Sequence, residues 1–87
     1  MSNHNRPEAI KRVARIHGHV HSIGKMLEEG RSYSEVVHQI SAVRSSLDSL
    51  TQVIVDDLVE DCVARAEKGE SVHETLLELK QVVANSR

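Results

Sequence analysis

Two histidines in the N-terminal third of the chain have the spacing of metal ligands. His17 and His21 lie four residues apart, so on a helix they share one face, as a two-histidine site for zinc, nickel or copper requires. His4 is a third candidate: once Met1 is removed, Ser2-Asn3-His4 offers an amino group, two amides and an imidazole to copper or nickel. The alternatives are a solvated or pH-responsive surface for the histidine pair, and an N-terminus without a metal role for His4.

The only cysteine, Cys62, lies in an acidic part of the sequence that includes Asp57, Glu60 and Asp61. Neighbouring negative charge and burial both make a thiol less reactive, so one interpretation of Cys62 is a small core residue. The other interpretation is a metal ligand. With oxygen donors from Asp57 or Asp61, the site would favour zinc or nickel over copper(I).

Basic residues gather in the first third of the chain. Residues 1–31 hold six Lys and Arg against three acids, a net charge of +3, although the whole chain carries −2. Lys11, Arg12, Arg15 and His19 fall within about two turns, on the side of the expected helix opposite its apolar residues. Cations so placed neutralise phosphates of DNA and release counterions, and the alternative is an ordinary solvated helix face.

These residues require helices to position them, and the sequence predicts three, at about residues 7–29, 33–68 and 72–85. Pro7 suits a first helical turn, and Ser32 with Glu35 and Ser71 with Glu74 have the spacing of capping boxes. Gly18 and Gly24 each weaken the first helix by ~1 kcal/mol relative to Ala, which favours packing or a close backbone approach at both. One buried stripe is expected on this helix, at Ile10, Val13, Ile16, Val20, Ile23 and Leu27.

The chain has 87 residues and one aromatic residue, Tyr33, so we expect a single helical domain, 1–87, with a small core. Its second helix is longer than the two shorter helices can cover, which indicates a homodimer. There is neither a signal peptide nor an apolar run of about 18 residues, so we expect a cytoplasmic protein that does not span a membrane. A glycine-rich phosphate loop and a paired nucleophile and base are both missing, which argues against an enzyme.

The segments RVARIHGHV (12–20), KMLEE (25–29) and QISAVRSSL (39–47) resemble the CsoR/RcnR/FrmR family of transcriptional repressors that sense metals or small molecules. The similarity extends without a gap from about residue 12 to 66. It implies an all-α, three-helix protomer with a long central helix, an antiparallel dimer that assembles into a tetramer, and repression at operator DNA that an effector relieves. It also implies a DNA surface formed by helix one and the middle of helix two, where Arg44 is the candidate.

The same resemblance places the sensor near Cys62. In the family, a cysteine early in helix two meets a His or Cys pair late in helix two of the neighbouring subunit, and the matching positions here are Tyr33, Leu58 and Cys62. Only Cys62 keeps a ligand, so the copper site is expected to be incomplete, because copper(I) needs at least two thiolate or imidazole ligands. Glu78 stands near a carboxylate position of the family's outer coordination shell.

We therefore expect a DNA-binding repressor whose operator affinity an effector modulates near the dimer interface. The effector would be a transition metal such as copper, nickel or zinc, or a reactive small molecule. A non-catalytic helical interaction module that has lost metal sensing is the alternative. A metal buffer that uses His4, His17, His21 and Cys62 ranks third.

Overall fold

The computed structural model describes residues 6–85, which form three helices joined by short turns. Helix α1 spans Arg6–Glu28, α2 spans Tyr33–Glu67 and α3 spans His73–Asn85. Each end lies within one residue of the range expected from the sequence, and the all-α fold with a long central helix is confirmed. No helix among the described residues is long and apolar enough to cross a membrane.

Local sequence explains where α1 and α2 begin and end. The hydroxyl of Ser32 accepts a hydrogen bond from the backbone N–H of Glu35 (3.2 Å), as the first capping box predicts. Gly30 and Gly69 follow the first two helices with φ of 71° and 74°, a left-handed conformation that glycine adopts without strain. The second capping box is not formed as expected, because the Ser71 hydroxyl accepts from the N–H of His73 (3.5 Å) rather than from Glu74.

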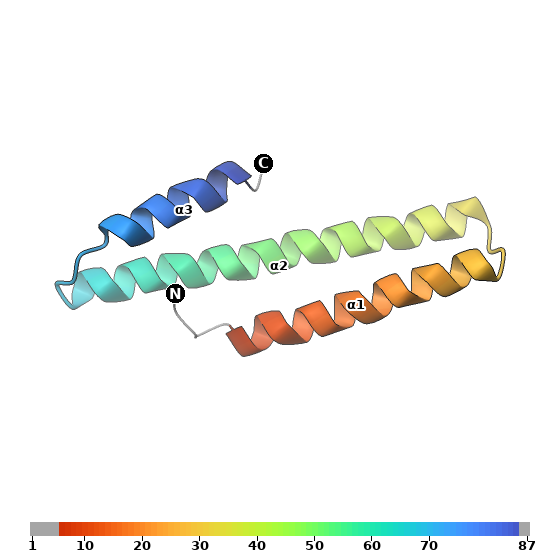
Figure 1. Cartoon of the computed structure of the whole chain (residues 1–87), viewed down its shortest axis with the longest axis horizontal. Helices are drawn as coiled ribbons and strands as arrows, with labels where there is room; N and C mark the ends of the chain where they lie inside the picture. Colours follow the sequence, from red (N-terminus) through yellow and green to blue (C-terminus); the bar gives the residue numbers. More distant parts are fainter. Residues whose placement is uncertain (1–5, 86–87) are drawn as a thin grey trace.

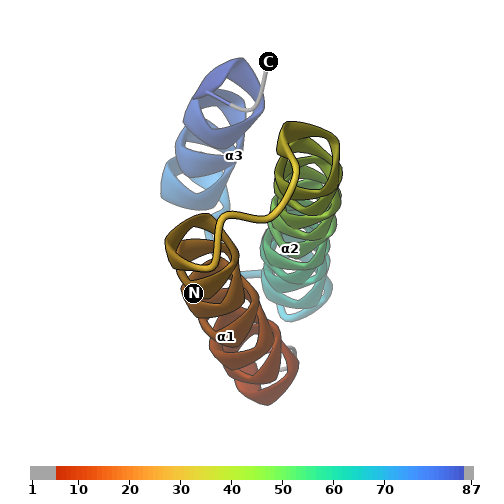
Figure 2. The ribbon, with the colours of Figure 1, turned by 90° about the vertical axis from the view of Figure 1, so that its right-hand side faces the viewer.

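The helices form a flat, elongated arrangement of 58 × 25 × 13 Å. Helix α1 runs antiparallel to the first part of α2, and α3 turns back along its last part (Figure 1). Seen end-on, α1 and α3 lie on the same side of α2, one above the other (Figure 2). They share no contact between described residues, so α2 alone connects them.

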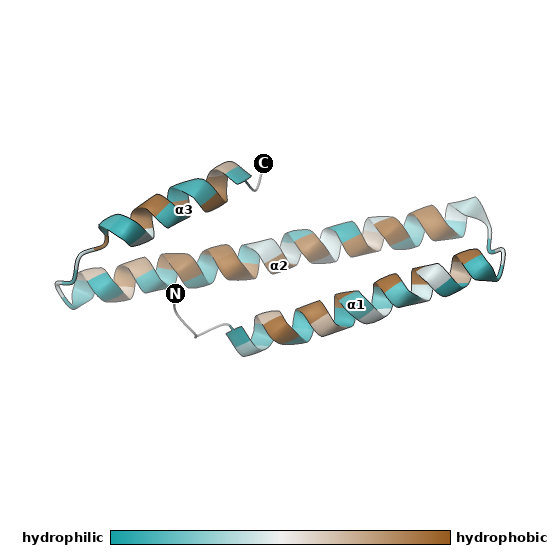
Figure 3. Cartoon of the chain, in the orientation of Figure 1, coloured by the Kyte–Doolittle hydropathy of each residue, from teal (hydrophilic) through white to brown (hydrophobic). Residues whose placement is uncertain are grey.

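The core of the single chain is small. Among the described apolar residues only Val36, Val43 and Leu58 are buried, with 6%, 8% and 2% of their surface exposed. Hydrophobic positions nevertheless recur along the full length of α1 and α2 (Figure 3). A large part of the apolar surface of this chain is therefore uncovered.

The prediction of one buried stripe on α1 is wrong for the single chain. Half-buried positions on α1 recur every three or four residues, at Ala9, Arg12, Ile16, His19, Ile23 and Met26. Four of the expected core residues are instead more than half exposed, at 63% for Ile10, 51% for Val13 and Val20, and 60% for Leu27. We call these four residues the apolar stripe. Hydrophobic periodicity identifies the apolar side chains that need a packing partner. It does not show whether that partner is another helix of the same chain or a second chain.

Candidate functional site

An open, polar hollow lies between α1 and α2. Arginine and histidine line it from α1, and two serines line it from α2; we call it the cationic hollow, and its residues are Glu8, Arg12, Arg15, Ile16, His19, Ser46 and Ser49. Three of the five predicted DNA-binding residues therefore meet in one place. Sequence reasoning missed Glu8, Ser46 and Ser49, although the i, i+3 spacing of the two serines already indicated a shared helix face.

Glu8 holds both arginines of the cationic hollow. Its Oε1 lies 3.2 Å from Nε of Arg12 and 3.7 Å from Nη2 of Arg15. The side chain of Arg12 is 35% exposed and that of Arg15 is 70% exposed. Pairs this exposed contribute at most about 1 kcal/mol, so a phosphate can displace Glu8 from either guanidinium at little cost.

His19 connects the two helices. Its Nε2 lies 2.6 Å from Oε1 of Gln39, and the pair is partly buried. Because an amide oxygen only accepts hydrogen bonds, Nε2 of His19 carries the proton in this contact. Arg12 and His19 therefore lie on the side of α1 that packs against α2, and not on the side turned away from it. This corrects the expected geometry of the basic surface. The contact between α1 and α2 includes half-buried polar residues as well as apolar ones.

Lys11 and Arg44 are exposed but do not line the cationic hollow. Arg44 follows Val37 and Ile40 and precedes Leu47 at helical spacing, and these three apolar residues are 59%, 44% and 46% exposed. The side of α2 that carries Arg44 is therefore an uncovered apolar face. In the single chain, α2 contributes serines to the hollow and not this arginine.

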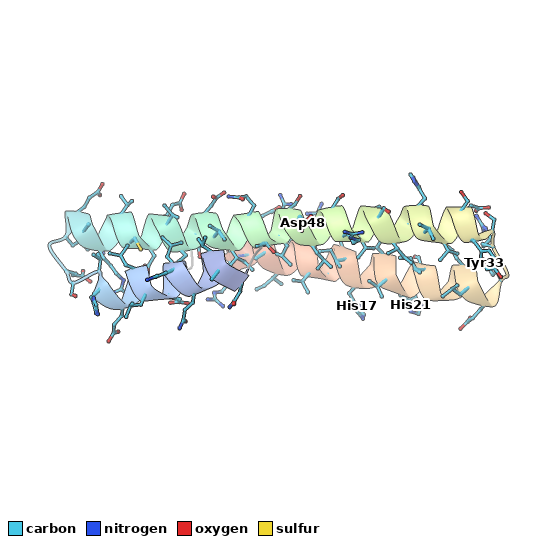
Figure 4. The ribbon with its side chains drawn as sticks, turned by 90° about the horizontal axis from the view of Figure 1, so that it is seen from above. His17, His21, Tyr33 and Asp48 are labelled. Carbon is cyan, nitrogen blue, oxygen red and sulfur yellow. The ribbon has the colours of Figure 1, made fainter. Side chains whose placement is uncertain are left out.

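The expected sensor positions are spread along α2. Tyr33 is 89% exposed at the start of the helix (Figure 4), and Cys62, 29 residues further on, is half-buried with a free thiol. At ~1.5 Å per residue the two lie roughly 44 Å apart. Leu58 is 2% exposed, among the most buried side chains of the chain. A single chain does not bring Tyr33 to Leu58 and Cys62.

The carboxylates near Cys62 are engaged elsewhere. Asp57 is 2% exposed and lines a groove on the side of α1. Asp61 accepts a hydrogen bond of 3.2 Å from Nε of Arg65, and Glu70 lies 3.6 Å from the same guanidinium. The hydrogen bond that Arg65 donates to Asp61, and then the negative charge of Asp61, raise the pKa of Arg65. Arg65 therefore remains cationic at any physiological pH.

Glu78 lines an open hollow between α2 and α3 with Asp61, Arg65, Ser71 of the turn before α3 and the first residues of α3. Within residues 6–85, no three His, Cys, Asp or Glu side chains come together as a possible metal site. The expected zinc or nickel ligation by Cys62 with an aspartate is thus not assembled within the described part of one chain.

His17 and His21 are both exposed and lie on the side of α1 turned away from α2 (Figure 4). They remain close to each other, one turn apart on a continuous helix. His4, the third predicted metal ligand, lies outside the described residues.

Two shorter helices packed along one long helix, with a cationic hollow and uncovered apolar faces, define an all-helical domain. The chain belongs to the family described as metal-sensitive transcriptional repressor, whose profile matches residues 5–85. This confirms the resemblance found in the sequence. It also confirms that the protein is not an enzyme, since the family consists of transcriptional regulators.

Individual relatives carry the names of metal sensors. The copper-sensing transcriptional repressor RicR of Mycobacterium tuberculosis is 37% identical over 76 residues, which cover 85% of this chain and 79% of RicR. The copper-sensing transcriptional repressor CsoR of Bacillus subtilis is 30% identical over 81 residues, 93% of this chain and 80% of CsoR. The structure of the nickel-responsive transcriptional regulator InrS matches with a TM-score of 0.83 and 31% identity, and the match covers 100% of this chain and 98% of that one.

Proposed function

We propose that this protein is a transcriptional repressor that binds operator DNA through the cationic hollow. The observation that carries the proposal is the convergence of Arg12 and Arg15 with Ser46 and Ser49 in one open hollow, in a chain of the repressor family. Guanidinium groups pair with phosphate oxygens and release counterions, and serine hydroxyls donate further hydrogen bonds to phosphate. Such contacts position a protein on the duplex. Because the named relatives are bacterial, and bacterial DNA lies in the cytoplasm, a cytoplasmic location is part of this proposal.

Lys11 and Arg44 take different places in this proposal. Lys11 precedes Arg12 on α1 and is exposed, so it extends the positive surface beyond the hollow and can contact a neighbouring phosphate of the DNA. Arg44 contacts DNA only if assembly brings its side of α2 beside the hollow of another copy. A variant of Arg15 therefore tests the hollow directly, whereas a variant of Arg44 tests the assembly as well.

The repressor acts as an oligomer in this proposal, a homodimer that pairs further into a tetramer. The apolar stripe of α1 and the exposed Ile40 and Leu47 of α2 leave a broad apolar surface in water, which is unfavourable by about 25 cal/mol per Å². An apolar groove continues this surface, lined by Arg6, Ala9, Ile10, Val13, Leu50, Val53, Ile54 and Asp57. A second copy of the chain offers the same surface in return, as a two-fold interface requires.

The effector is proposed to act near Cys62, where an antiparallel second copy would bring its Tyr33. Copper(I) does not fit these residues, because Tyr33 and Leu58 provide no soft ligand to accompany the thiolate. A nickel or zinc ion, or a reagent that modifies the thiol, is compatible with one cysteine. Binding near Cys62 changes operator affinity only if the effector prefers one of two subunit arrangements.

DNA binding is tested with the DNA upstream of the protein's own gene, titrated at several salt concentrations. We expect Arg15→Ala to weaken binding and to lower the slope of log K against log salt by about 1. Lys80→Ala removes an exposed cation of α3 outside the hollow and serves as the matched control. Equal behaviour of the two variants would show that the hollow does not contact DNA.

The effector is tested in the same assay with copper(I), nickel, zinc and sulfane sulfur, each against Cys62→Ser. Release of DNA that requires Cys62 supports the proposed sensor. Release that is unchanged in Cys62→Ser places the sensor elsewhere. Absence of DNA binding at low salt would favour the helical interaction module.

A further inference from the structure

Within residues 6–85, His17 and His21 present two imidazoles that no other side chain engages. No hydrogen bond or ion pair with another described residue engages either ring, in contrast to His19, whose Nε2 is held by Gln39. Helix α1 is continuous through both positions, so their Cβ atoms are ~5–6 Å apart, a separation that lets two side chains reach one point. Figure 4 shows both on the same side of α1.

In the single chain the surface around the two rings is open. The residues one turn from either histidine contain no carboxylate: they are Val13, Ala14, Gly18, Val20, Gly24 and Lys25. A Cβ built on Gly18 or Gly24 would meet nothing within 4 Å, so the glycines next to the pair leave room for a hydrated ion. Lys25, one turn after His21, adds a positive charge that weakens cation binding without blocking it.

We propose that His17 and His21 chelate a borderline divalent transition-metal ion, of the class of zinc, nickel and copper(II), on the outer side of α1. Neutral imidazoles suit these ions, whereas calcium and magnesium prefer oxygen donors. Two protein ligands leave the remaining coordination positions to water. The site requires neither Cys62 nor DNA, so it stands apart from the sensor proposed above.

The position of the pair on α1 relates it to assembly. His17 follows Val13 by four residues and precedes Val20 by three, so it lies in line with the apolar stripe, as Gly24 does, while His21 lies further toward the polar side of the helix. An ion held there carries its water shell onto the apolar surface, so it competes with a second copy for this side of α1. The site is thus a place where a metal ion acts on α1 directly, independently of the end of α2 that carries Cys62.

The test uses zinc chloride as the probe and the full chain with His4→Gln and Cys62→Ser as the background. These two changes remove the N-terminal motif and the thiol, which are the other candidate ligands. Zinc is titrated by calorimetry, and the imidazole signals are followed by NMR. We expect one ion per chain, with the signals of His17 and His21 shifting together and that of His38 unmoved.

Two variants in this background separate chelation from mere histidine content. His17→Gln should abolish the titration, while His38→Gln, which removes a solitary exposed histidine of α2, should leave it intact. His21→Gln combined with Ser22→His keeps two histidines but spaces them five residues apart, on different faces of α1, and should also lose binding. Circular dichroism shows whether each variant keeps its helices. Retention of zinc binding in His17→Gln or in the respaced variant, or no binding in the background protein, overturns the proposal.

Discussion

Replacing each glycine of α1 by alanine tests which side of the helix faces water and which side faces a second copy, because the change in stability should differ between the two sides. Gly18 and Gly24 both lie inside α1, and an added Cβ meets nothing within 4 Å at either one. In the isolated chain both substitutions should therefore stabilise α1 by the full difference in helix propensity, ~1 kcal/mol. That amounts to about a fivefold change in the unfolding equilibrium.

The two positions differ in what the assembly does to them. Gly24 lies four residues after Val20 and three before Leu27, in line with the apolar stripe, whereas Gly18 lies on the polar side of α1. If a second copy packs on the stripe, a methyl group at Gly24 separates the helices there. We expect Gly18→Ala to gain ~1 kcal/mol per chain, and Gly24→Ala to gain less or to lose stability and shift toward monomer.

Urea unfolding at two protein concentrations measures the free energies of both variants, and light scattering during gel filtration measures their mass. Equal gains for both variants with an unchanged mass would refute the reasoning, because the backbone at Gly24 would then face water in the assembly too.

Three further predictions concern other residues. Glu8→Gln frees Arg12 and Arg15 from their anionic partner and should tighten binding to upstream DNA by about two- to fivefold at low salt; anisotropy titrations check this, and unchanged affinity would place DNA away from Glu8. Leu58→Ala empties the most buried apolar position and should cost about 2–5 kcal/mol in urea unfolding, so a cost well under 1 kcal/mol would contradict its burial. Tyr33→Cys with Leu58→His should create a copper(I) site with Cys62, seen by competition with a copper(I) chelator, if chains pair antiparallel; affinity equal to that of the parent protein would argue against that pairing.

The helices were predictable because their end signals are local. Ser32 with Glu35 defines the start of α2, and Gly30 and Gly69 adopt the left-handed conformation that ends a helix. These signals act within one turn, so a single sequence contains them. The start of α3 followed the same principle, although Ser71 hydrogen bonds to His73 instead of Glu74.

The side of each helix that is buried in the chain was less predictable. Hydrophobic spacing on α1 could not show that Ile16 packs on α2 while Val20 remains half exposed. Both residues are apolar, and the sequence pattern does not distinguish the partner on which each one packs. The hydrogen bond between His19 and Gln39 joins residues 20 positions apart, and only the way α1 crosses α2 determines it. For the same reason the hollow includes Ser46 and omits Arg44.

The thickness of the chain has a consequence for how it folds. The three helices form a slab 13 Å thick in which only five of the described residues are buried, so in a lone chain almost every side chain borders water. In the proposed dimer, a second slab laid on the first encloses a larger interior. If the chains pair in this way, folding and association are linked, and the melting temperature should rise with protein concentration by mass action. In that case the fraction of folded protein would depend on how much of it the cell makes.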